Sequence, residues 1–320
     1  MRVIQPSVEI MRTGLEIDFM GPEQFIEKVG RTCYKSEDKI TDDSAVKFVS
    51  NLIKRGHEAM IEHWNLIYRF IDYGEFMDFV ESKTSIEHSS GLMFRLRLTD
   101  REDADGNRFC YVSGNMRSWR DYIKAWIDRG SVIPHACYTP IQEYPVFFPE
   151  YQDLAKNIKN HVLMSVSVHE LAAPERRVHQ NVTLKFVCDR GVSHEIVRHR
   201  VASFAQESTR YCNYSKDQFG NEITVIRPSW CYEGDREYDI WFRGCERAEN
   251  TYFDMLVGGA TPQEARSVLP NSLKTEVIVT MNLNDWYHFF DLRCVASAHP
   301  DMQEVAEMAE GLFHLEGLKR

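Results

Sequence analysis

Segments with the alternating pattern of β-strands are interspersed irregularly with helical segments, and this order constrains the fold most. Apolar and polar side chains alternate along residues 182–190 and 91–100, and this period of two predicts half-buried strands. Residues 275–282 are rich in β-branched side chains and predict a further strand. A turn sequence at 103–107 precedes another strand-like run at 109–113, so a hairpin is expected there.

Helical periodicity marks the rest of the chain. Apolar residues recur at helical spacing along 43–57, 116–130, 192–199, 235–256, 284–293 and 300–313. Thr261, Pro262 and Glu264 form the pattern of a capping box, and Asn284 is predicted to cap the helix at 284–293. The Pro-rich stretch at 130–151 is predicted to be irregular.

Strict alternation of strands and helices would indicate a doubly wound parallel sheet, and this chain lacks it. The pattern predicts an α+β fold with a central mixed or antiparallel sheet flanked by helices. No linker, repeat or low-complexity tract interrupts the 320 residues, so a single domain over residues 1–320 is expected.

Composition disfavours several classes of protein. Lys and Arg total 38 against 48 Asp and Glu, a formal charge of −10, which disfavours sequence-independent nucleic-acid binding. The eight cysteines include no C-x-x-C pair, as expected for reduced thiols rather than a disulfide scaffold. No apolar run approaches the roughly 20 residues of a membrane span, and the first residues lack the apolar core of a signal peptide. These features predict a cytoplasmic protein that does not bind membranes.

Anion-binding side chains are concentrated in residues 198–211, RHRVASFAQESTRY. Guanidinium groups suit phosphate and carboxylate oxygens. In a continuous helix Arg198 and Arg200 would point about 200° apart, so both could face one ligand only if the helix ends before them. With Ser208 and Arg210 following, the segment predicts sites for two anionic ligands. A solvated basic turn is the alternative.

Other catalytic patterns are weak or missing. His194 and His199 are five residues apart, which places their rings roughly 140° apart on a helix, so they cannot act as an H-E-x-x-H zinc pair. No dinucleotide-binding glycine pattern, P-loop or G-x-S-x-G turn is present. No metal site is predicted, and a nucleophilic serine is disfavoured.

The chain resembles the flavin-dependent thymidylate synthases of the ThyX type. Their signature is RHR, seven residues, then Ser, and this sequence reads RHR-VASFAQE-S. Flanking blocks that are similar to the family, in the family's order, are GHEAMIEH, DRGVSHE, EARSVLP and NLNDWYHFFDLR. The region at about 73–170 is longer than in a minimal member and matches locally at SGNMRSW, so it is expected to be an insertion.

The resemblance implies a site for each ligand. The positions that match the dUMP site are Glu195, Arg198, Gln206, Ser208, Arg210, Arg266 and Arg293. The positions that match the FAD site are Arg198, His199, Arg200, Gln206, Asn282, Asn284 and His288. Arg293 matches the arginine that polarises the uracil, and His63 matches a histidine near the folate and flavin. Gln206 and Glu195 depart from the acidic residue and the Gln that are usual in the family.

The resemblance also implies an activity: reductive methylation of dUMP to dTMP, with methylenetetrahydrofolate as carbon donor and NADPH-reduced FAD as hydride source. The family fold is ThyX-like α+β, and the family enzyme is a homotetramer. Two alternatives are another FAD- or nucleotide-dependent oxidoreductase on the same scaffold and, in a different class, an RNA-binding module that uses the RHR segment and aromatic side chains.

Overall fold

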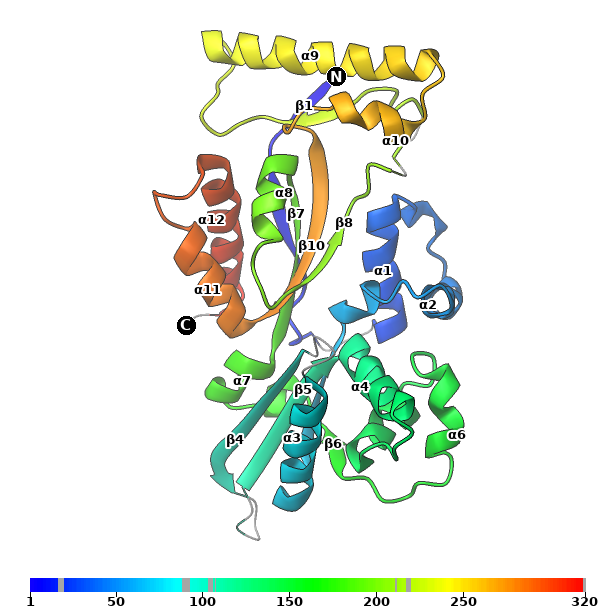
Figure 1. The fold of residues 1–320 in the computed structure, drawn as a ribbon. Helices are drawn as coiled ribbons and strands as arrows, with labels where there is room; N and C mark the ends of the chain where they lie inside the picture. Colours follow the sequence, from blue (N-terminus) through cyan, green and yellow to red (C-terminus); the bar gives the residue numbers. More distant parts are fainter. Residues whose placement is uncertain are drawn as a thin grey trace.

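Two four-stranded antiparallel sheets form the body of the protein (Figure 1). This computed structural model describes residues 1–16, 20–87, 93–102, 106, 108–210, 212–216 and 220–318. One sheet has the order β2-β7-β10-β8, and the other has the order β4-β5-β3-β6. A third, two-stranded sheet pairs β1 with β9 in parallel. The fold is therefore α+β with antiparallel sheets, as expected, but the strands form a second four-stranded sheet that the sequence did not predict.

The bounds of the strands are as follows. The first antiparallel sheet contains β2 (Ser7–Arg12), β7 (Asn181–Asp189), β8 (Ser203–Gln206) and β10 (Lys274–Asn282). The second contains β3 (Asn65–Phe70), β4 (Phe94–Glu102), β5 (Arg108–Asn115) and β6 (Leu163–Ser165). The parallel pair is β1 (Arg2–Ile4) and β9 (Thr224–Ile226).

Each strand predicted from alternation is confirmed. β10 pairs with β7 along its whole length, from Lys274 opposite Asp189 to Asn282 opposite Asn181. β4 and β5 are antiparallel neighbours, as the predicted hairpin requires, although the turn at 103–107 lies almost wholly outside the described residues.

The helices are as follows. Before β7 come α1 (Pro22–Tyr34), α2 (Ser44–Lys54), α3 (Tyr73–Glu87), α4 (Met116–Asp128), α5 (Tyr138–Glu143), α6 (Gln152–Ala155) and α7 (Ala173–His179). After β7 come α8 (Arg190–Ile196), α9 (Arg236–Val257), α10 (Pro262–Ala265), α11 (Leu283–Arg293) and α12 (Pro300–Leu315). The predicted capping box of α10 is present, with Glu264 Oε2 accepting from Thr261 N at 2.8 Å. The expectation of an irregular stretch at 130–151 is wrong in part, because α5 forms there.

Two helices of the site start directly at strand ends. Asp189, the last residue of β7, caps α8 by accepting from Val192 N at 2.7 Å, so no separate turn intervenes at 189–191. Asn282, the last residue of β10, caps α11 by accepting from Asp285 N at 2.9 Å, so the cap predicted at Asn284 is wrong. Because β7 and β10 are antiparallel, the two helices start at opposite ends of the sheet and run toward each other.

The faces of the first sheet are covered differently. On one side α8, α11 and α12 pack against it (Figure 1), in a core that includes Phe186, Trp286 and Phe313. On the other side Ala205 and Ile278 join the core that contains Phe25 and Ile26 of α1. All eight cysteines are free thiols. Among the described residues, no helix combines the length and apolarity needed to cross a membrane.

Candidate functional site

Three of the predicted site residues meet where α8 and α11 approach each other. Arg293 Nη1 donates to Glu195 Oε2 at 2.6 Å, and Arg293 Nε donates to His199 Nε2 at 2.8 Å. A weaker contact joins Arg293 Nη2 to the carbonyl of Glu195 at 3.5 Å. Arg293 ends α11, and Glu195 lies in the last turn of α8. The residue proposed from the sequence to act on the uracil is therefore held by two other predicted site residues.

His199 is neutral in this arrangement. Burial lowers the pKa of its imidazole to about 4, with further lowering by the positive charge of Arg293 and by His288. Since Nε2 accepts from Arg293, the ring hydrogen is on Nδ1. The ring also packs against Phe289, with 4.7 Å between centroids. A neutral acceptor at this position orients the guanidinium without repelling it.

The two arginines of the signature lie beyond the end of α8. The helix ends at Ile196, so the condition under which both could face a ligand is met. Arg198 and Arg200 are exposed, whereas His199 between them is buried. Neither arginine forms an ion pair within the described part of the chain. Their donors are available to an anion.

Gln206, Ser208, Arg210 and Arg266 lie around the end of β8. Gln206 Nε2 donates to Ser193 Oγ of α8 at 2.9 Å, which ties this strand to the helix that bears Glu195. Arg266 Nη1 donates to Thr209 Oγ1 at 3.2 Å, and the amide of Arg210 donates to Ser208 Oγ at 3.4 Å. EARSVLP and the signature are thus adjacent in space.

The residues expected on the flavin side divide between surface and interior. Asn284 and His288 are exposed on α11, whereas Asn282 is buried as the cap of that helix. Asn282 also lines a narrow polar cavity between the two sheets, together with Arg95, Ser113, Ser203 and Asp285.

Arg95 belongs to this cavity although the sequence reasoning did not select it as a site residue. Arg95 Nη2 donates to Asp285 Oδ2 at 2.6 Å. Burial raises the pKa of the Asp285 carboxyl, and the charge of Arg95 opposes that shift. The signal available in the sequence was the polar face of the alternating segment 91–100, on which Arg95 lies.

His63 has no exposed surface. Its Nδ1 is 2.8 Å from Thr280 Oγ1 of β10, and Thr280 lines the polar cavity. Burial lowers the pKa of His63 to about 3. His63 therefore contacts a residue that lines the cavity, and its place near the folate and flavin stays a prediction. Within the described residues, no group of three or more His, Cys, Asp or Glu side chains is arranged to hold a metal ion.

Comparison with known proteins assigns the chain to a family. Residues 150–314, just over half of the chain, match the sequence model of the family described as "Thymidylate synthase complementing protein". The chain belongs to this family. The match to the thymidylate synthase complementing proteins includes every predicted site residue except His63.

Named relatives of the family extend the likeness. The chain is 37% identical over 120 residues to the flavin-dependent thymidylate synthase of Pyrococcus furiosus. The matched residues make up 37% of this chain and 48% of that relative. The chain is 34% identical over 134 residues to that of Pyrococcus abyssi, covering 41% and 54%. It is 32% identical over 117 residues to that of Geobacter sulfurreducens, covering 37% and 49%. The matched part thus spans about half the length of these relatives, and the resemblance to flavin-dependent thymidylate synthases is confirmed.

Proposed function

We propose that the protein is a flavin-dependent thymidylate synthase that methylates dUMP reductively to dTMP. The observation that supports this most is the contact of Arg293 with Glu195 and His199, because it joins the RHR signature to the residue expected to act on the uracil. Methylenetetrahydrofolate is the proposed carbon donor, and NADPH is the proposed reductant.

The donors around the signature are suited to FAD, whose pyrophosphate is anionic. Arg198 and Arg200 offer exposed guanidinium groups beyond the end of α8. The residues proposed to hold FAD are Arg198, His199, Arg200, Gln206, Asn282, Asn284 and His288. When bound, FAD would supply the redox chemistry between NADPH and the transferred one-carbon unit.

The second proposed ligand, dUMP, would lie against Arg293. A guanidinium has five N–H groups, and three of them in Arg293 are engaged by Glu195 and His199. The other two have no acceptor among the described residues and would be available for a uracil oxygen. Fixed donors there would stabilise negative charge on the ring as its C5 becomes nucleophilic.

The phosphate of dUMP is proposed to bind around the end of β8. Ser208, Arg210 and Arg266 are gathered there, and we propose that Arg198, Gln206 and Glu195 complete the dUMP site. Gln206 donates to Ser193, and this bond fixes the end of β8 beside α8.

The proposal extends to the domain organisation and the oligomeric state of the protein. We propose one catalytic domain over residues 1–320, with an insertion at about 73–170 that supplies β4, β5 and β6. Arg95 of this insertion reaches the cavity lined by Asn282, so the insertion would contribute to the site. A homotetramer in the cytoplasm, acting on small molecules and binding neither nucleic acid nor membranes, completes the proposal.

The test is dTMP formation by purified protein from dUMP, methylenetetrahydrofolate, FAD and NADPH, with each component omitted in turn. Product that requires all four would support the proposal. A yellow protein that oxidises NADPH without forming dTMP would keep the flavin site and refute the methylation. A colourless, inactive protein after addition of FAD would refute both.

A further inference from the structure

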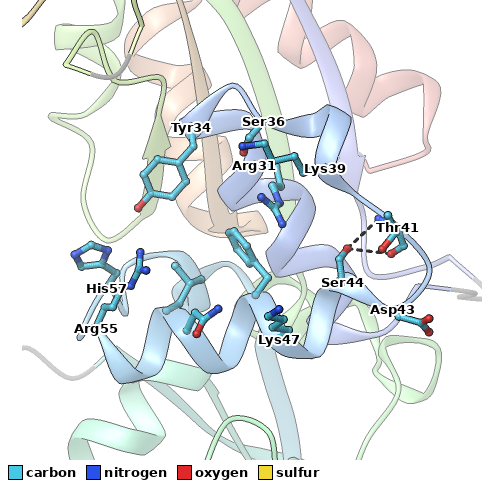
Figure 2. A pocket seen from close by; sticks show the side chains of 13 residues that line it. Arg31, Tyr34, Ser36, Lys39, Thr41, Asp43, Ser44, Lys47, Arg55 and His57 are labelled. Atoms are coloured by element: carbon cyan, nitrogen blue, oxygen red, sulfur yellow. Dashed lines mark hydrogen bonds between the residues drawn. The ribbon is translucent and has the colours of Figure 1, made fainter.

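A basic groove lies between α1 and α2, outside every site residue considered so far. It encloses about 760 Å³, within the range of sites for small molecules. Figure 2 shows its lining side chains, which come from the end of α1, the following loop and one face of α2. The basic ones are Arg31, Lys39, Lys47, Arg55 and His57, and Asp43 is the single acid among the described residues that line it.

The wall of the groove is fixed by buried contacts. Glu27 is 1% exposed and accepts from Arg31 Nε and Nη2 at 3.1 and 3.0 Å and from Ser44 Oγ at 2.7 Å. Arg31 also lies over the ring of Phe48, 4.6 Å from its centroid. A Cβ on Gly30 would lie 2.6 Å from Phe48, so glycine is what lets this ring approach α1.

Arg31 pairs with Glu27, but three other cations that line the groove have no ion-pair partner among the described residues. Lys39, Lys47 and Arg55 are exposed, and none of them forms an ion pair within the described part of the chain. The nearby acid Glu37 lies outside the lining and pairs with Lys35 at 3.7 Å. In a chain with a formal charge of −10, such a group of unpaired cations indicates an anionic ligand.

One end of the groove adjoins the proposed nucleotide site. Tyr34 lines the groove, and the carbonyl of the preceding residue, Cys33, accepts from Ser208 N at 3.3 Å. Lys35, the following residue, pairs with Glu207 and Glu276. A ligand that reaches from the site past Tyr34 would enter the groove.

We propose that this groove binds the polyanionic end of a co-substrate whose other end reacts at the proposed active site. The inference rests on the proposed function. Two co-substrates have such an end: a reductant with a phosphorylated adenosine, and a folate with a chain of glutamates. Both present several negative charges on a flexible arm, which the three unpaired cations would bind.

The test is a double variant, Lys47→Ala with Arg55→Ala, compared with the matched control Lys28→Ala with Lys54→Ala. The control removes the same charge from exposed positions of α1 and α2 that do not line the groove. Direct binding is measured for adenosine 2′,5′-bisphosphate against 5′-AMP, and for folate triglutamate against monoglutamate. The groove variant should weaken one polyanion about tenfold or more at low salt, with a loss that shrinks as salt rises, while the control keeps wild-type affinity.

Each outcome has a separate meaning. Weaker binding of the bisphosphate alone assigns the groove to the reductant, and weaker binding of the triglutamate alone assigns it to the folate. If the groove variant binds both polyanions as the wild type does, the groove is refuted as a ligand site. The same holds if the variant changes its mass in light scattering while its binding of both polyanions stays unchanged. Binding is measured without turnover, so the two proposals can fail separately. If the wild-type protein forms no dTMP but the groove variant still binds a polyanion more weakly than wild type, the proposed synthase is refuted and the anion site is not.

Discussion

Replacing Arg293 with alanine separates a catalytic role from a structural one. The ion pair with Glu195 is partly exposed, with side chains 20% and 32% accessible, so its loss should lower the free energy of unfolding by only about 1 kcal/mol. Removing a fixed donor to a developing negative charge costs roughly 10²–10³ in kcat, equivalent to about 3–4 kcal/mol. Activity should therefore fall much more than stability.

The assay combines three readouts. We expect dTMP formation to fall at least a hundredfold, while flavin absorbance after gel filtration and the urea midpoint change little. The pKa of His199, followed by NMR, should rise toward its ordinary value, because the charge of Arg293 contributes to its lowering. Arg247→Ala, on the exposed surface of α9, is the control. Normal turnover by Arg293→Ala with FAD bound would refute the assigned role.

Three further changes test the packing around the site. Burial lowers the pKa of His63 to about 3 and of His199 to about 4 in the folded protein. Below about pH 6.5 the unfolded chain therefore binds protons that the folded protein does not. The free energy of unfolding should be highest above that pH and fall by up to about 1.4 kcal/mol per pH unit for each histidine below it. A urea midpoint that stays constant from pH 7 to pH 5 would contradict this. Gly114→Ala should lower the free energy of unfolding by about 1–3 kcal/mol, because its Cβ would clash with the ring of Phe94 on the facing strand. Gly244→Ala, in open space on α9, should raise it by up to about 1 kcal/mol in the same urea titration; equal effects would refute the packing argument. Asp189→Ala removes the cap of α8 and should cost about 1 kcal/mol in thermal unfolding, whereas an unchanged Tm would show that the cap is dispensable.

Local periodicity was sufficient for most elements but not for their arrangement. The alternation of residues 182–190 and the β-branched run of 275–282 predicted β7 and β10, because side-chain burial follows the pleat of a strand. The division into two sheets depends on pairing between distant segments, which no local pattern encodes. The cap of α11 illustrates the limit. Both Asn282 and Asn284 are suitable caps by residue type. Asn282 caps the helix because β10 ends at that residue.

The site shows the same division. The concentration of arginines at 198–210 indicated anion binding from the chemistry of the guanidinium group. The structure shows that α8 ends at Ile196, before Arg198 and Arg200, as the convergence of these two side chains on one ligand requires. The meeting of Arg293 with His199 joins residues 94 positions apart, and neither a local pattern nor the resemblance to a family predicted this contact. The burial of His63 and the place of Arg95 in the cavity follow from the contact of the two sheets, which the sequence did not reveal.

The order of strands in the first sheet has a consequence for biosynthesis. β8 precedes β10 in the chain yet pairs with it, and β10 is inserted between β8 and β7. While the chain emerges from a ribosome, β8 must wait about 70 residues for the strand that holds it, and Arg293 emerges later still. Such long-range pairing slows folding and leaves strand edges exposed in the interim. The signature segment would therefore be synthesised before the strand that holds it and acquire its geometry among the last events of folding, when the nascent protein is most open to aggregation or to help from chaperones.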